Sequence, residues 1–212
     1  MRVFILNTGR AGSTTIARAC KHITNYTSGH ETLAKKFGEE RFQYPDNHID
    51  ADNRLSWHLG QMNEKFGDDA FYVHLKRNRD EVTQSHMNRY FKNGSIIEAF
   101  CEGIRLVPTV KMTQEQRIQA CYDYQDTVDA NIRHFLADKT KKMNIDLENI
   151  EKEFPIFWEK IGAEGDFEKA MDEVRTKHNP STKKGNLKLR YRFKLLFWRE
   201  WYHLKYNRKP FQ

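Results

Sequence analysis

Two hydrophobic patterns alternate along the chain and predict an alternation of strands and helices. Short apolar and β-branched runs bounded by turn or charged residues are typical of buried strands; they cover residues 2–7, 70–75 and 143–147, with a shorter run at 25–27. Apolar residues at helical spacing predict helices; they cover residues 14–22, 53–66, 80–90, 113–138, 148–161 and 166–177. Ser13 or Thr14 is the expected N-cap of the first helix. Because strands alternate with helices, we expect an α/β domain with a mainly parallel central sheet and a helix-rich C-terminal half.

The length and composition favour a single folded domain over residues 1–212. A chain of 212 residues can bury about 70% of its extended surface. Its 14 Phe, 9 Tyr and 4 Trp are too many for a disordered chain, and no linker rich in Pro, Gly or Ser divides it. No apolar run approaches the roughly 20 residues of a membrane span, and Asn7, Thr8 and Arg10 interrupt any signal-peptide pattern. We therefore expect a protein without a transmembrane segment.

The cysteines and the net charge limit the compartment and the partners. Cys20, Cys101 and Cys121 are odd in number and widely spaced, which matches neither a disulfide framework nor a zinc site, so we expect a reduced, cytoplasmic protein. Lys and Arg number 36 against 29 acidic residues, which gives a net charge of +7. Such a field attracts anions, and nucleic acid, an acidic membrane surface or a phosphorylated small molecule would each satisfy it.

The segment between the first predicted strand and helix has several features of an anion site. Residues 8–15 read Thr-Gly-Arg-Ala-Gly-Ser-Thr-Thr. Small residues let backbone N–H groups converge on an anion, and a helix N-terminus adds about half a positive charge. Ser13, Thr14 and Thr15 add hydroxyl donors, and Arg10 adds a planar cation suited to oxyanions. A plain turn with an exposed arginine is the alternative.

This loop is not a Walker A motif, because no lysine precedes Ser13 or Thr14. A nucleoside triphosphatase also needs a metal-binding carboxylate after a later strand, but residues 76–79 read Lys-Arg-Asn-Arg and repel a divalent cation. Metal-dependent phosphoryl transfer is therefore disfavoured. The nine histidines form no cluster with ligand spacing, so we expect no metal site.

A second basic segment follows the strand predicted at 70–75. Arg77 stands at its carboxyl end, where ligands of open α/β sheets bind. Ser85 comes eight residues later, one or two turns into the next predicted helix, so both side chains can reach one oxyanion. A solvated, charged loop is the alternative.

Together these two segments resemble the sulfotransferase family. In that family a Lys/Arg-x-Gly-Thr/Ser-Thr loop holds the 5′-phosphosulfate of the donor 3′-phosphoadenosine 5′-phosphosulfate, and Arg10-Ala11-Gly12-Ser13-Thr14 looks like that loop. The second motif, Arg-Asn-Pro-Arg-Asp followed by a helical Ser, holds the 3′-phosphate. The segment Arg77-Asn78-Arg79-Asp80 differs from it by Arg79 in the proline position, and Ser85 falls at the expected place. The match covers residues 1–90 well and the remainder thinly. Arg10, Ala11 and Thr15 differ from the residues that are common at these positions in the cytosolic steroid and phenol enzymes.

The resemblance implies a P-loop-like fold and a division of the domain. Residues 1–90 would bind the donor, 91–185 would supply acceptor-side helices and a late donor loop, and 186–212 would form a basic, aromatic C-terminal helix. The segment Ser181-Thr-Lys-Lys-Gly resembles the family's late loop over the 3′-phosphate, with Lys183, Lys184 and Gly185 as candidate contacts. A plain basic surface loop is the alternative there. The product would be adenosine 3′,5′-bisphosphate, and the family requires no metal.

The resemblance also suggests the base that would deprotonate a hydroxyl or amine acceptor. Residues 28–32 read Ser-Gly-His-Glu-Thr and resemble the Gly-Glu-Glu-Thr segment of the tyrosylprotein branch, which supplies the base. Aligned on the Glu-Thr ending, Glu31 is the first candidate and His30 the reserve. A carboxylate that merely stabilises a helix N-terminus is the alternative for Glu31.

The basic and aromatic tail at residues 187–206 supports two competing hypotheses. Basic and aromatic residues interleave there as in grooves that bind nucleic-acid strands, and the same mixture is used by helices at membrane surfaces. The spacing of its apolar residues also fits the core face of a terminal helix. The enzyme hypothesis expects no nucleic-acid partner, and peripheral membrane contact stays open.

Overall fold

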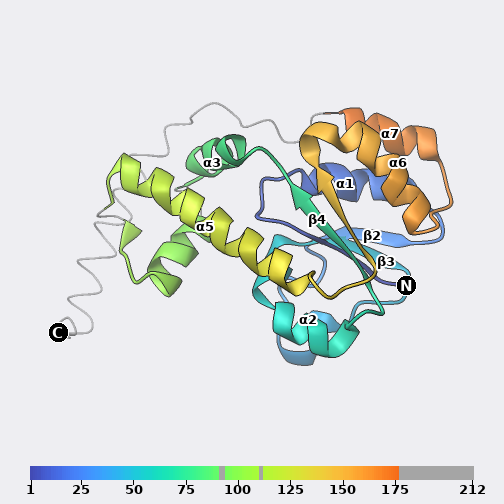
Figure 1. Cartoon of the computed structure of the whole chain (residues 1–212), viewed down its shortest axis with the longest axis horizontal. Coiled ribbons are helices and arrows are strands. Elements are labelled where there is room, and N and C mark those ends of the chain that lie inside the picture. Colours follow the sequence, from blue (N-terminus) through green and yellow to red (C-terminus); the bar gives the residue numbers. More distant parts are fainter. Residues whose placement is uncertain (91–93, 110–111, 177–212) are drawn as a thin grey trace.

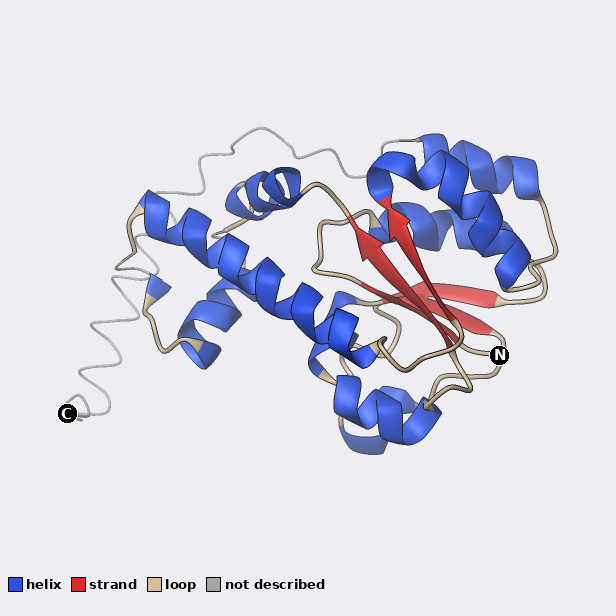
Figure 2. Cartoon of the chain, viewed as in Figure 1, coloured by secondary structure: helices blue, strands red, loops and turns tan. Residues whose placement is uncertain are grey.

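The computed structural model describes residues 1–90, 94–109 and 112–176, and the centre of this region is a sheet of five parallel strands (Figure 2). The strands are β1 (Val3–Leu6), β2 (Thr27–His30), β3 (His48–Ala51), β4 (Phe71–Lys76) and β5 (Lys142–Asp146). Their order in the sheet is β2-β3-β1-β4-β5, and each neighbouring pair is parallel. The prediction of an α/β domain with a mainly parallel central sheet is confirmed.

Helices cover both faces of this sheet (Figure 1). The α-helices are α1 (Ser13–Ala19), α2 (Leu59–Phe66), α3 (Arg79–Met87), α4 (Ile96–Ala99), α5 (Gln114–Phe135), α6 (Ile150–Lys160) and α7 (Phe167–Arg175). Helices α1, α6 and α7 pack on one face, and α2 and α5 pack on the other. None of the helices in the described ranges is long and apolar enough to cross a membrane.

The side chains of β1 explain why both faces are covered. Val3 and Ile5 lie in the core beneath α1, α6 and α7, whereas Phe4 and Leu6 lie in the core beneath α2 and α5. All four are fully buried. Because successive strand residues point to opposite faces, a strand that is apolar throughout must be covered on both sides. The continuous apolar run in the sequence therefore corresponds to the central strand of the sheet.

Two expectations about the helices were wrong. Gly12, and neither Ser13 nor Thr14, is the N-cap of α1, because the backbone enters the helix in the left-handed region (φ 97°). The stretch 53–66 is not one helix: a 3-10 turn at Asn53–Trp57 ends at His58, where the backbone leaves helical geometry, and α2 follows.

The strand expected at residues 25–27 is displaced, and one strand is additional. Strand β2 begins at Thr27 and continues to His30, where it pairs with β3. Strand β3 was not predicted, because His48 and Asp50 interrupt its apolar pattern although both are buried.

The parallel topology brings the two predicted anion-binding segments to one edge of the sheet. Strands β1 and β4 are neighbours with Leu6 opposite His74, so their carboxyl ends lie side by side. The loop 8–12 leaves β1 and the loop 77–78 leaves β4 at this edge. A ligand that binds beyond the carboxyl ends of the strands would contact both loops.

Candidate functional site

The loop between β1 and α1 has the backbone of a tight anion-binding turn. Gly9, Arg10 and Gly12 all have positive φ, at 73°, 60° and 97°. A side chain at Gly12 would also collide with Leu147, whose Cδ1 atom would lie 2.5 Å from the added Cβ. Glycine is favoured at position 12 because a φ of 97° strains any residue with a Cβ atom, and because the Leu147 side chain would also have to move. Arg10 adopts the left-handed conformation without being glycine, which is uncommon.

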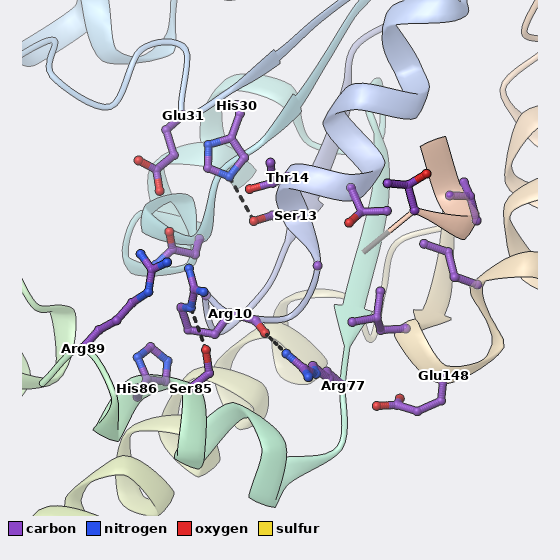
Figure 3. Close-up of a pocket in the computed structure, with 18 of the residues that line it drawn as sticks. Arg10, Ser13, Thr14, His30, Glu31, Arg77, Ser85, His86, Arg89 and Glu148 are labelled. Carbon is purple, nitrogen blue, oxygen red and sulfur yellow. Dashed lines mark hydrogen bonds between the residues drawn. The ribbon is translucent and has the colours of Figure 1, made fainter. Parts of the chain in front are cut away.

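Arg10 connects this loop to the second segment. Its Nε donates to the Ser85 hydroxyl at 2.9 Å, and Arg77 Nη1 donates to the Arg10 carbonyl at 3.2 Å (Figure 3). Burial lowers the pKa of Arg10, and the like charges of Arg89 and Arg77 lower it further. Arg77 is also held by Glu81, one helical turn away. Two motifs that are about 70 residues apart in sequence therefore form one contact network, and its cations are close enough to repel one another.

His30 and Glu31 approach the same loop from the carboxyl end of β2. The Ser13 hydroxyl and His30 Nε2 are 3.0 Å apart, and Glu31 follows with a positive φ of 56°. Arg54 Nη1 lies 2.6 Å from Glu31 Oε1. The Glu31 side chain is thus fixed at the rim of the cleft, with one carboxylate oxygen in an ion pair.

A buried polar network centred on Asp50 of β3 holds the segment that follows β2 and carries Glu31. Asp50 Oδ1 accepts hydrogen bonds from the Thr32 amide (3.2 Å) and the Thr32 hydroxyl (2.7 Å). Asp50 Oδ2 accepts from the Tyr44 hydroxyl at 3.0 Å, and Arg41 donates to Tyr44 and to Asp52. Burial raises the pKa of Asp50, although the hydrogen bonds from Thr32 oppose the shift. Because buried polar groups without partners are costly, this network specifies the path of the loop.

These side chains line a cleft of about 1340 Å³. Nine residues predicted from the sequence line it: Arg10, Gly12, Ser13, Thr14, Thr15, His30, Glu31, Arg77 and Ser85. Ala11 is fully buried in the hydrophobic core instead, so its side chain does not face the cleft. Lys183, Lys184 and Gly185 lie outside the described residues. In Figure 3, His30 and Glu31 lie on one side of Arg10 and Arg77 on the other.

The cleft also contains residues that were not predicted. Asn53, Arg54, His86, Arg89, Leu147 and Glu148 line it. Arg89 follows Ser85 at a spacing of four residues, so the helical spacing could have identified it once Ser85 was chosen. Arg54 follows the unpredicted strand β3, and nothing in its local sequence distinguishes it.

His86 is a neutral histidine at the wall of the cleft. It is 6% exposed, and burial lowers its pKa to about 4, with a further contribution from the charge of Arg10. A hydrogen bond to the Thr8 backbone acts in the opposite direction. Its Nε2 atom has no hydrogen-bond partner among the described residues. His86 therefore adds a polar edge to the cleft and no charge at neutral pH.

Trp57 and His58 are packing residues rather than part of the cleft. Trp57 packs against Phe100 and Tyr124, and His58 lies edge-on to Phe42. Within the described ranges, no group of three or more His, Cys, Asp or Glu side chains is arranged to hold a metal ion.

Comparison with known proteins identifies the fold. No family model matches the chain, and no curated protein matches it. Among solved structures, the chain is similar to the sulfotransferase domain from the curacin biosynthetic pathway, with a TM-score of 0.58 and 12% identity. The likeness covers 87% of this chain and 80% of that domain. The chain therefore has a sulfotransferase-like fold.

Proposed function

We propose that this protein is a sulfotransferase that moves a sulfuryl group from 3′-phosphoadenosine 5′-phosphosulfate to a hydroxyl or amine acceptor. The observation that carries the proposal is the contact of Arg10 with Ser85 and Arg77 at the carboxyl ends of β1 and β4. These residues belong to the two segments whose sequences resemble the donor-binding motifs of the family. The sulfotransferase-like fold supports the proposal independently.

In this proposal the donor's two anionic ends occupy the two segments. The loop from Arg10 to Thr15 holds the 5′-phosphosulfate through backbone N–H groups, hydroxyls and the Arg10 guanidinium. Arg77 and Ser85 hold the 3′-phosphate. Lys183, Lys184 and Gly185, which lie outside the described residues, are the further candidate contacts of this phosphate.

The transfer step is an in-line displacement at sulfur. The acceptor oxygen or nitrogen forms a bond to sulfur, the bond from sulfur to the bridging phosphate oxygen breaks, and adenosine 3′,5′-bisphosphate leaves. Glu31 accepts the acceptor's proton, with His30 as the alternative base. Arg10 stabilises the charge that develops on the leaving phosphate, because a fixed cation costs no reorganisation at that moment.

The competing hypotheses of nucleic-acid or membrane-surface binding rest on the tail at residues 187–206, which lies outside the described residues. The sulfotransferase-like fold does not favour either of them. Nucleic-acid binding would still give a measurable result in the test below, through the oligonucleotide.

The test is thermal unfolding with adenosine 3′,5′-bisphosphate, adenosine 5′-monophosphate, ATP or an oligonucleotide. A bound ligand adds RT ln(1 + [L]/Kd) to stability, about 2.7 kcal/mol at 100-fold excess over Kd. We expect the bisphosphate to raise the melting temperature most.

Arg77→Ala should weaken the affinity for the bisphosphate by about tenfold or more, because a charge-assisted contact is lost. Its affinity for the monophosphate should stay nearly unchanged.

Arg79→Ala is the matched control. Arg79 is two residues away, pairs with Asp126 and stacks on Tyr122, and does not line the cleft. If Arg77→Ala lost affinity for the bisphosphate and the monophosphate equally, Arg77 would not bind the 3′-phosphate. Stabilisation by ATP or an oligonucleotide that exceeds that of the bisphosphate would contradict the proposed donor.

A further inference from the structure

One end of the cleft carries a cation to which the proposed donor contacts assign no role. Arg89 lines the cleft and is partly exposed. Among the described residues, no carboxylate forms a salt bridge with it. Figure 3 places Arg89 on the Glu31 side of Arg10, away from Arg77. This is the end at which an acceptor must approach Glu31.

The charges around Arg89 do not cancel. Among the acidic residues that line the cleft, Glu31 lies at this end in Figure 3, and its carboxylate is engaged by Arg54 at 2.6 Å. The nearby Arg10 is a like charge whose pKa Arg89 helps to lower. His86 is neutral near pH 7, and Glu148 lies on the far side, beyond Arg77 (Figure 3). An uncompensated guanidinium in a cleft of this size is stabilised by an anionic ligand.

We propose that the acceptor is acidic: a hydroxylated compound whose carboxylate is bound by Arg89 while its hydroxyl is directed toward Glu31. This inference rests on the proposed function. The guanidinium of Arg89 offers a planar fork that can bind a carboxylate with two parallel hydrogen bonds. The contact between Arg89 and the carboxylate would also orient the acceptor. With its carboxylate held at Arg89 and its hydroxyl at Glu31, the acceptor is fixed at two points in the cleft.

Discrimination against neutral acceptors follows from the same geometry. A neutral acceptor would cover Arg89, remove its water and leave its donors without a partner, which costs free energy. A site built to bind a charged group therefore rejects an analogue that lacks it more strongly than an apolar pocket rejects an extra methylene.

The experiment measures binding to protein that is already saturated with adenosine 3′,5′-bisphosphate, so that acids cannot enter the donor site. The probes are two matched pairs of hydroxylated compounds: 4-hydroxyphenylacetate with 4-hydroxyphenylacetamide, and glucuronate with glucuronamide. Calorimetric titration should show at least one acid binding about tenfold or more tightly than its amide. In Arg89→Gln the acid and the amide should bind equally, while bisphosphate affinity stays unchanged.

Arg133→Gln is the control, because Arg133 lies exposed on α5 and is not among the residues that line the cleft. Equal binding of acid and amide in the unmodified protein, no binding of either acid, or a preference that survives Arg89→Gln would each overturn the inference. A loss of bisphosphate affinity in Arg89→Gln would assign Arg89 to the donor and overturn it as well. If the bisphosphate itself does not bind, the result contradicts the proposed function, and it is distinguishable from a failure of the acceptor inference alone.

Discussion

Glu31 combines an uncommon backbone conformation with a fixed side chain. A non-glycine residue at φ 56° costs of order 1 kcal/mol and persists only where its surroundings impose it. Those surroundings are the ion pair with Arg54 and the bonds from the following Thr32 to Asp50. The conformation directs Glu31 into the cleft beside Ser13 and His30, which motivates its proposed role as the base.

Glu31→Gln should depress turnover by about 10²-fold or more, because the amide keeps the shape and loses the basicity. Bisphosphate affinity should be unchanged. Turnover is measured as bisphosphate released from the donor with the better acceptor of the pairs above. Glu39→Gln is the control, since Glu39 is exposed and pairs with Lys65. Normal turnover in Glu31→Gln, together with its loss in His30→Gln, would identify His30 as the base.

At the scale of elements, the sequence predicts what local patterning determines. Strands β1 and β4 are nearly continuous apolar runs, so their positions and burial could be predicted closely. Strand β3 could not, because His48 and Asp50 read as polar positions, and their buried side chains bond to Thr27 and Thr32, which are about 20 residues away in sequence. The break at His58 is similar: Trp57 turns toward Phe100 and Tyr124, and tertiary packing overrides the helical spacing.

The Asp50 network gives a prediction at this scale. Asp50→Asn replaces a charged acceptor by a neutral amide, whose NH₂ group must face either the Thr32 amide, which cannot accept, or the Tyr44 hydroxyl, which already accepts from Arg41, so the buried network is weakened. The free energy of unfolding should fall by about 1–3 kcal/mol, and kcat should fall more than the affinity for the bisphosphate, because the Glu31 segment loosens while the loop at Arg10 does not. Urea unfolding and donor titration measure these two effects.

Asp46→Asn is the matched control for Asp50→Asn. Asp46 is exposed and pairs with Arg2, so its loss should change stability by less than about 0.5 kcal/mol. Equal effects of the two substitutions on kcat would show that the buried network does not position Glu31.

At the scale of the whole molecule, the candidate site arises from the sheet order. The sequence predicts that Arg10 and Arg77 follow strand ends and that Ser85 lies in the helix after the second strand, and the parallel pairing of β1 with β4 brings them into contact. Arg54 could not be predicted as a cleft residue, because its position depends on where the unpredicted strand β3 packs. A basic net charge indicates an anionic ligand, but the tertiary structure is needed to divide that charge between a donor end and an acceptor end.

The fold as a whole should lose stability in acid through His86. The folded pKa of about 4 lies below the usual 6.5, so between these values the unfolded chain binds more protons than the folded one. The contribution of His86 to the free energy of unfolding is complete above pH 6.5 and declines as the pH falls toward 4, by up to about 3 kcal/mol.

His86→Asn keeps a donor for the Thr8 backbone and cannot titrate, whereas the control His134→Asn alters an exposed histidine on α5. Urea unfolding between pH 4 and 7.5 should show the stability difference between the unmodified protein and His86→Asn shrinking as the pH falls. A difference that stays constant across this range would mean that His86 is not held neutral by burial.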